Sequence, residues 1–196
     1  KGTLRVHNTE ILTDGLTARY LGGPVRIDVT SEPAGAHGAF DTVLRASGRT
    51  PGAPLGQALE LPEKVHVSGS IDWRASARIA RSTEQAPRPS RLRFDSQLRG
   101  VEIGLPEPMT RSASDNGGLH IDSQWGETEA TARIVYGGAT RAALKFSNSG
   151  EGWRLERGAA RFGGGEAQLP KEPGLWLTGS IAALDLSEWL ALKSDR

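Results

Sequence analysis

The sequence predicts an all-β protein: one large, curved antiparallel sheet that forms a groove or half-barrel, followed by a short C-terminal helix. From Val65 to Ile79, every odd position is apolar or glycine and every even position is polar, a period that places alternate side chains on opposite strand faces. Similar alternation recurs along most of the chain. The stretches that interrupt it are rich in glycine and proline, as hairpin connections are. Helical periodicity occurs only near the C-terminus.

The first half of the chain is expected to contain four shorter strands before the long one. Gly22-Gly23-Pro24 predicts a hairpin turn, because glycine tolerates positive φ and proline fixes the direction of re-entry. Residues 48–63 lose the alternation and predict a loop with one helical turn around Leu55–Leu59. The shorter strands are expected around residues 4–6, 16–20, 25–29 and 40–46, and the long strand at 65–79 would extend roughly 50 Å.

The second half continues the pattern, with one change of phase. The apolar positions are even from Leu92 to Leu98 and odd from Val101 onward, so we expect a β-bulge or a sharp bend at Gly100. Asp185 is expected to cap a helix that places Leu186, Trp189 and Leu190 on one face. Further strands are expected at residues 119–125, 129–136, 140–147, 152–157, 159–162 and 175–181.

Composition limits the functional classes. The chain has 196 residues, 37% of them hydrophobic, which is enough for an ordered protein, and we expect one domain over residues 1–196. The formal net charge is +1, without the basic excess that is typical of nucleic-acid binders. No cysteine is present, which excludes disulfides and thiolate metal sites. No stretch resembles a signal peptide or a membrane-spanning helix, and we expect the chain to be a segment of a longer protein.

Catalytic and metal-binding patterns are missing from the sequence. The four histidines, at positions 7, 37, 66 and 120, have no partner at a metal-ligand spacing, and no G-x-S-x-G motif occurs. His66 and His120 are interpreted as exposed or locally hydrogen-bonded side chains. Trp73 and Trp189 are interpreted as packing residues, and Trp176 as exposed. The residues therefore predict no catalytic residue, metal or cofactor, and favour passive binding, scaffolding or association.

Three stretches carry a resemblance to a known family. They are LTARYLGGPVRIDV at 16–29, SQLRGVEIGLPEPMTRSA at 96–113 and PGLWLTGSIAALDLSEWLAL at 173–192. The middle stretch is the most specific, with its Ser-x-Leu-x-Gly-Val and Leu-Pro-x-Pro motifs followed by a basic residue. Together with the long strand, these stretches resemble the YhdP-type, AsmA-like envelope proteins of Gram-negative bacteria. The resemblance covers most of the chain, as an interior portion of a full family member.

The resemblance implies a periplasmic β-groove, anchored to the inner membrane by a part of the protein outside this segment. The implied task is to move phospholipid between the inner and outer membranes, with the acyl chains sheltered on the apolar side of the sheet. One-sided strands and the resemblance together predict a lining formed by Val65, Val67, Ile71, Trp73, Phe94, Val101, Ile103, Leu144, Phe146, Leu175 and Leu177.

Two other functional classes compete with this hypothesis. In the first, the apolar faces close on each other as a β-sandwich, and the protein is a structural module for association in the envelope. In the second, the chain is a hydrolase or a glycan-active enzyme, which no residue pattern supports. The unpaired edges of a sheet segment also predict edge-to-edge pairing with another copy.

Overall fold

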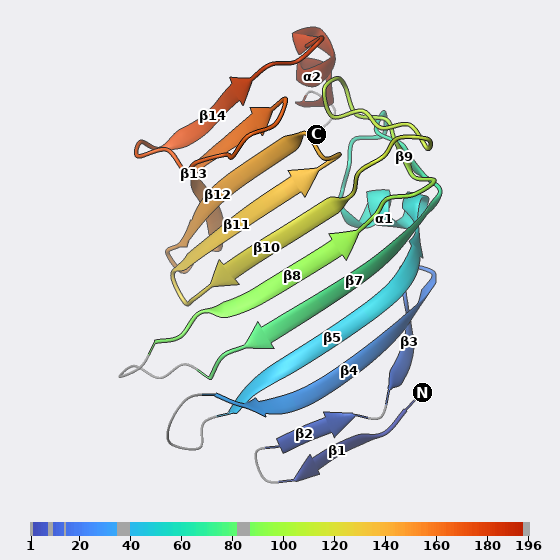
Figure 1. Cartoon of the computed structure of the whole chain (residues 1–196), viewed down its shortest axis with the longest axis vertical. Coiled ribbons are helices and arrows are strands. Elements are labelled where there is room, and N and C mark those ends of the chain that lie inside the picture. Colours follow the sequence, from blue (N-terminus) through green and yellow to red (C-terminus); the bar gives the residue numbers. More distant parts are fainter. Residues whose placement is uncertain (1, 8–9, 14, 35–39, 82–86, 194–196) are drawn as a thin grey trace.

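One open, twelve-stranded sheet dominates the computed structural model, which describes residues 2–7, 10–13, 15–34, 40–81 and 87–193 (Figure 1). The strands lie in the order β1-β2-β4-β5-β7-β8-β10-β11-β12-β13-β14, and β3 also pairs with β4. The strand pairings of this sheet are antiparallel, except that β13 pairs with β14 in parallel. Residues 163–173 carry the chain back to the end at which β13 began, so β14 runs in the same direction as β13. The predicted all-β fold with one large curved sheet is therefore confirmed, with one parallel pairing that the sequence analysis did not expect.

The strands of this sheet alternate in direction along most of the chain. Those of the first half are β1 (Leu4–His7), β2 (Glu10–Thr13), β3 (Leu16–Tyr20), β4 (Gly23–Pro33), β5 (Phe40–Pro51), β7 (Ser70–Ile79) and β8 (Ser90–Ser96). Those of the second half are β10 (Leu119–Trp125), β11 (Glu129–Tyr136), β12 (Thr140–Asn148), β13 (Trp153–Phe162) and β14 (Gly174–Gly179). A separate small sheet pairs β6 (Val67–Ser68) with β9 (Glu102–Ile103).

The predicted long strand is two strands, so the expectation of one unbroken strand over 65–79 was wrong. Gly69 separates β6 from β7 and has a φ of +84°, which glycine adopts without strain. A side chain at this position would collide with the carbonyl oxygen of Gly100. The chain therefore leaves the main sheet at Gly69, and β6 pairs with β9 instead.

The change of phase at Gly100 marks a sharp bend rather than a bulge. Leu98 and Gly100 both have positive φ, and the Val101 N–H donates to the Leu98 carbonyl at 3.3 Å. β8 ends at Ser96 in the main sheet, and β9 then belongs to the small one. Of the two predicted alternatives, a β-bulge and a sharp bend, the bend is confirmed.

Three other boundaries differ from those predicted. β5 continues to Pro51, so the loop begins later than expected, and the helical turn within it is α1 (Gly52–Ala58). The hairpin between β3 and β4 turns at Leu21 and Gly22, and Gly23 already begins β4. The strands predicted at 152–157 and 159–162 are one strand, β13, whose register against β12 slips at Glu156.

The C-terminal helix α2 (Leu186–Lys193) begins as predicted. The Asp185 carboxylate accepts hydrogen bonds from the backbone N–H groups of Ser187 at 2.8 Å and Glu188 at 3.1 Å, and this lowers the pKa of Asp185. The Trp189 indole N–H donates to the Glu107 carbonyl at 2.8 Å, while Leu186 and Leu190 are exposed. The Trp189 side chain thus joins the helix to the loop at Glu107, while the two leucines face water.

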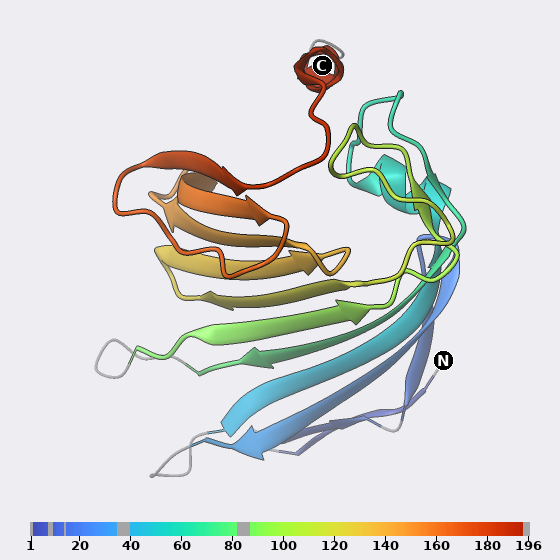
Figure 2. The same cartoon turned by 45° about the horizontal axis from the view of Figure 1, so that its top comes forward.

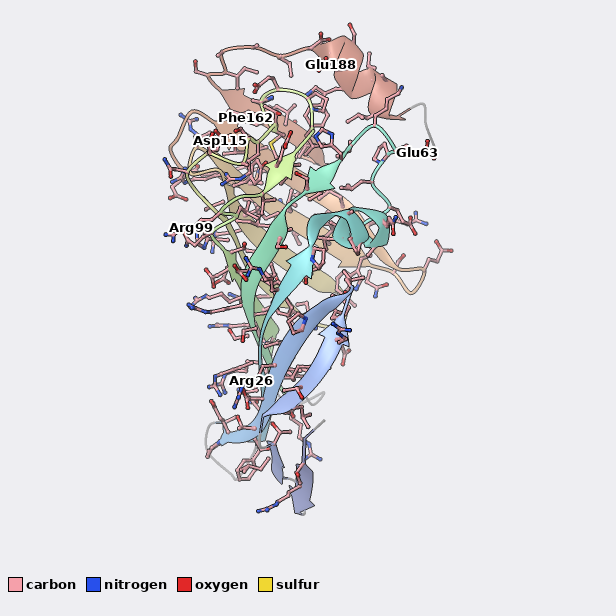
Figure 3. The ribbon with its side chains drawn as sticks, turned by 90° about the vertical axis from the view of Figure 1, so that its right-hand side faces the viewer. Arg26, Glu63, Arg99, Asp115, Phe162 and Glu188 are labelled. Carbon is pink, nitrogen blue, oxygen red and sulfur yellow. The ribbon has the colours of Figure 1, made fainter. Side chains whose placement is uncertain are left out.

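The most deeply buried cluster lies at one end of the strands. Residues 52–69 and 97–118, which include α1, β6 and β9, form a unit that we call the end cap. Ile71 of the main sheet packs there against Leu98 and Val101, and Val101 is 0% exposed. Figure 2 shows the bent sheet with α1 and the neighbouring loops above one end of its strands. Figure 3 shows α1 and Glu63 on the opposite side of the ribbon from Arg26 and Arg99.

Candidate functional site

The two faces of the main sheet have opposite chemistry. Residues paired directly across neighbouring strands point to the same side, so the strand register shows which side chains share a face. Tracing the register from β3 to β14 gives one unbroken line of apolar side chains across ten strands, which we call the apolar row. It consists of Leu16, Ile27, Ala46, Ala75, Phe94, Ile121, Ile134, Ala142, Ala160 and Leu177.

The face that contains this row, the apolar face, is not closely covered in the middle of the sheet. Phe94, Ile121 and Ile134 are only half-buried, although they lie in the middle of the sheet. In the described part of the chain, the small β6–β9 sheet is the only other sheet, and it belongs to the end cap. The apolar face is therefore not the inner layer of a sandwich formed by the described residues.

Aromatic stacking fixes part of this face beside the end cap. The rings of Trp73 and Phe94 stack with centroids 6.2 Å apart and planes 20° from parallel. The Trp73 indole N–H donates to the Thr50 hydroxyl at 2.9 Å, which satisfies its one polar atom. The interpretation of Trp73 as a packing residue is confirmed, and Trp176, on the other face, is exposed as predicted.

Seven of the predicted lining residues lie on the apolar face. Ile71 is covered by the end cap, Trp73 packs against the same cluster, and the register places the other five further along the face. Leu144 and Leu175 both lie against Gly158, where a Cβ atom would be 2.7 Å from Leu144 Cδ2. The seven residues are Ile71, Trp73, Phe94, Leu144, Phe146, Leu175 and Leu177.

The remaining four, Val65, Val67, Val101 and Ile103, belong to the end cap. Val65 and Val101 are buried, and Val67 and Ile103 pack against the Ile71 cluster and pair with each other across the small sheet. Because Gly69 and Gly100 redirect the chain, these residues do not continue the stripes of β7 and β8. They cover the apolar face at one end instead of extending it.

Several residues of the face were missed by sequence reasoning. Ile27, Leu44, Ile121 and Ile134 occupy the same face as Phe94, and each belongs to an alternating stretch that predicts a strand. Alternation within a strand was visible in the sequence. The register between strands, which aligns these residues into one row, was not.

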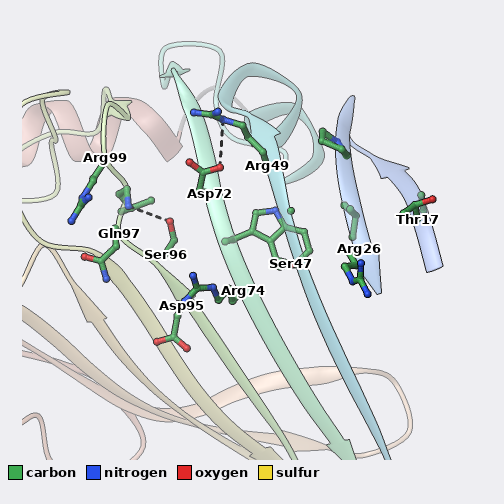
Figure 4. A pocket seen from close by; sticks show the side chains of 16 residues that line it. Thr17, Arg26, Ser47, Arg49, Asp72, Arg74, Asp95, Ser96, Gln97 and Arg99 are labelled. Atoms are coloured by element: carbon green, nitrogen blue, oxygen red, sulfur yellow. Dashed lines mark hydrogen bonds and ion pairs between the residues drawn. The ribbon is translucent and has the colours of Figure 1, made fainter. Parts of the chain in front are cut away.

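The opposite face, the polar face, carries charged side chains in cross-strand pairs. Arg93 and Asp122 are 3.1 Å apart, and Arg49 and Asp72 are 3.4 Å apart. A hollow of about 760 Å³ opens on this side, and Figure 4 shows it among Arg26, Arg49, Arg74 and Arg99, with Asp72 and Asp95. This hollow lies among charged side chains, on the side away from the apolar row.

One carboxylate of the polar face is buried. Asp41 is 1% exposed and accepts from Arg88 Nη1 at 2.8 Å, Arg88 Nη2 at 2.9 Å and Arg78 Nη1 at 3.3 Å. Burial raises the pKa of Asp41, but the hydrogen bonds from Arg88 and Arg78 outweigh it and lower the pKa overall. Arg78 also pairs with Glu32, which Arg45 contacts at 2.7 Å. This network ties β4, β5 and β7 together.

The histidines have local partners. His120 Nδ1 lies 2.7 Å from the Asp95 carboxylate, and His66 Nε2 lies 3.4 Å from Glu102, both at exposed positions. This confirms the interpretation of His66 and His120. The side chain of His7 and the whole of His37 lie outside the described residues. No group of three or more His, Asp or Glu side chains in the described ranges is arranged to hold a metal ion.

Neither helix in the described ranges has the length and hydrophobicity needed to span a bilayer.

Comparison with known proteins gives one match. The chain matches the family model described as YhdP protein over residues 1–196. No curated protein matches it significantly, and no solved structure does. The match covers the apolar face, the polar face and the end cap alike.

Proposed function

Because the chain belongs to the YhdP family of AsmA-like envelope proteins, we propose that its apolar face shelters the acyl chains of phospholipids in transit. One observation carries the proposal: an apolar row crosses ten strands and is only half-buried in the middle of the sheet. A monomeric protein rarely exposes so large a contiguous apolar surface without a ligand or partner for it. A hydrocarbon ligand matches a surface that offers no polar contact along this row.

The energetics favour hydrocarbon as the ligand. Each CH₂ withdrawn from water contributes about 0.8 kcal/mol, so a sixteen-carbon chain requires roughly 10 kcal/mol of apolar shelter. Ten strands spaced about 4.8 Å apart make the row roughly 45 Å long, more than one extended tail. Headgroups would remain in water, so the face needs no polar site to bind them.

The proposal includes a location and a wider role. The segment would lie in the periplasm, within a protein anchored to the inner membrane by another part of its chain. It would form one section of a lipid path between the inner and outer membranes, and so support the lipid balance and permeability barrier of the outer membrane. No catalytic step is needed for passive burial of this kind.

Site-directed photocrosslinking tests the proposal with neighbouring positions as matched controls. A benzophenone amino acid at Ile121 points to the apolar face, and the same group at Asp122 points to the polar face. We expect crosslinks to phospholipid at position 121 and none at position 122, in cells that express the full-length protein. A folded variant with no lipid at position 121 would contradict the proposal. Crosslinks there to a protein alone would support the structural-module hypothesis instead.

A charge on the apolar face sharpens the same test. Phe94→Asp places a carboxylate next to Ile121, where hydrocarbon would otherwise lie, and should lower lipid crosslinking at position 121 at least about tenfold. Arg93→Asp adds a carboxylate on the other face and should leave the crosslinking unchanged. Ile71 is unsuitable for this experiment because it is part of the buried cluster.

Edge-to-edge association stays a prediction. The outer edge of β14 has no partner strand among the described residues, and its Leu175 and Leu177 are exposed. Sedimentation of the purified chain at several concentrations would measure such pairing.

A further inference from the structure

The apolar face has two unequal ends. At the capped rim, where β7 begins and β8 ends, the end cap covers Ile71 and packs against Leu119 and Tyr136. At the open rim, where β7 ends and β8 begins, Ile79 is exposed, whereas Ser90 is buried and its hydroxyl accepts a hydrogen bond from the Ala80 N–H. Along β7 the exposure of its apolar side chains rises from 5% at Ile71, through half-buried Ala75, to 48% at Ile79.

A hydrogen bond from Tyr136 of β11 joins the cap to the sheet, and the bonds of Arg111 hold the cap together internally. The Tyr136 hydroxyl donates to the Met109 carbonyl at 2.9 Å, and burial raises the pKa of this phenol. Arg111, itself buried, donates through Nη2 to the Leu98 carbonyl at 3.0 Å and the Asp115 carbonyl at 2.6 Å. Breaking such bonds would leave buried polar groups unsatisfied, so we expect the cap to stay in place against the sheet at this rim.

The uncovered distance is matched to one lipid tail. From Trp73 at the cap to Ile79 at the open rim the strand advances six residues, or about 20 Å at ~3.3 Å per residue. The hydrocarbon of one leaflet is about 15 Å thick, half of the ~30 Å core of a bilayer. A tail that lies along the strands therefore fits between the cap and the open rim.

Hydroxyl groups lie on this face at both rims, but Thr50 and Ser96 beside the cap are buried, whereas Ser31 and Thr42 near the open rim are half-buried. In the middle of the face the side chains are Ala46, Ala75 and Phe94, whereas Ser31 and Thr42 pair on this face near the open rim. The half-buried Trp125 ends β10 at that rim. Indole and hydroxyl groups suit a boundary between hydrocarbon and water.

We propose that a bound phospholipid has one orientation, with its acyl ends toward the capped rim and its headgroup at the open rim beside Ser31, Thr42 and Trp125. This inference rests on the proposed function. It follows because the cap closes one way out of the face, and a zwitterionic or anionic headgroup cannot be buried against it without a large desolvation cost. Headgroups would then line one side of the whole path.

Two photoreactive phosphatidylethanolamines test the orientation. One carries a diazirine on the headgroup and the other on the terminal carbon of an acyl chain, and each is supplied to the purified chain in phosphatidylethanolamine–phosphatidylglycerol vesicles. Peptide mapping should place headgroup crosslinks near Thr42 and Trp125, and tail crosslinks near Trp73 and Tyr136, with at least about a fivefold bias. Equal or reversed labelling at the two rims overturns the orientation but retains the proposed function. Absence of crosslinks from both lipids overturns the proposed function as well.

A pair of charge substitutions gives an independent readout. Ala75→Asp puts a carboxylate in the tail zone and should reduce tail crosslinking at least about tenfold, whereas Thr42→Asp lies at headgroup level and should change it less than about twofold. Circular dichroism and thermal unfolding establish that both variants fold. If folded Thr42→Asp loses lipid as completely as folded Ala75→Asp, the open rim is not the headgroup side.

Discussion

The two faces of the sheet differ in how their side chains contact water. On the polar face, long charged side chains pair across strands, as Arg45 does with Glu32 at 2.7 Å and Lys145 with Glu129 at 2.6 Å. On the apolar face, the buried hydrophobic cluster lies at the end cap, and the middle of the row stays half-buried. The difference indicates that, among the described residues, the polar face has side-chain partners on the protein itself, whereas the middle of the apolar face does not. The apolar face is the one to which we assign a ligand, and its most closely packed residues are those that the cap covers.

The largest expected effect comes from placing a charge in the end cap. Val101→Asp buries an unpaired carboxylate at a position that is 0% exposed, and should lower the free energy of unfolding by more than about 4 kcal/mol. Ile134→Asp, in the half-buried middle of the apolar row, should lower the free energy of unfolding by about 1–2 kcal/mol, because water reaches its carboxylate. Urea unfolding of both variants measures the comparison. Equal losses would mean that the apolar face is as closed as the cap.

A smaller effect is expected from the buried carboxylate of the polar face. Asp41→Asn should lower the free energy of unfolding by about 2 kcal/mol at pH 7, less than for a fully buried pair because Arg78 and Arg88 remain partly exposed. Urea unfolding measures this loss. Asp122→Asn, at an exposed position, is the matched control and should change little.

The pH dependence of this site follows from the lowered pKa of Asp41 in the folded state. The unfolded chain has the ordinary value of about 3.9, so it binds this proton first as the pH falls. The stabilisation is therefore complete above about pH 5, declines below the unfolded value, and is lost as the pH falls through the folded pKa. The Asn variant should lack this contribution to acid unfolding. A variant that keeps the wild-type acid transition would contradict this account of the network.

The smallest effect is expected from an exposed ion pair on the same face. Arg93 and Asp122 have side chains that are 68% and 50% exposed, so their attraction is weakened by water and salt. Arg93→Ala should change the free energy of unfolding by no more than about 0.5 kcal/mol, and added salt should reduce the difference. A loss above about 1 kcal/mol would show that single pairs, and not the whole charged surface, stabilise the polar face.

Much of the fold was predictable because period-two alternation is a local property. Ala75 and Phe94 could be placed on the apolar side of their strands from their immediate neighbours alone, and the Asp185 cap could be read from a few residues. The end cap was not predictable in this way. Val67 and Val101 continue apolar patterns in the sequence, yet Gly69 and Gly100 turn them out of the main sheet. A side chain at Gly69 would collide with the distant Gly100 carbonyl, and Gly100 has a φ of +69°, so neither feature is visible in the local alternation.

The sequence by itself determined that each strand has one apolar and one polar face, because side-chain direction alternates with every residue of an extended chain. Tertiary structure alone decided that Ile27, Phe94, Ile121 and Ile134 form one row, because register depends on hydrogen bonds between distant strands. It also decided which end of the strands is covered. The cap joins residues 52–69 to residues 97–118, and this long-range packing leaves no mark in local alternation.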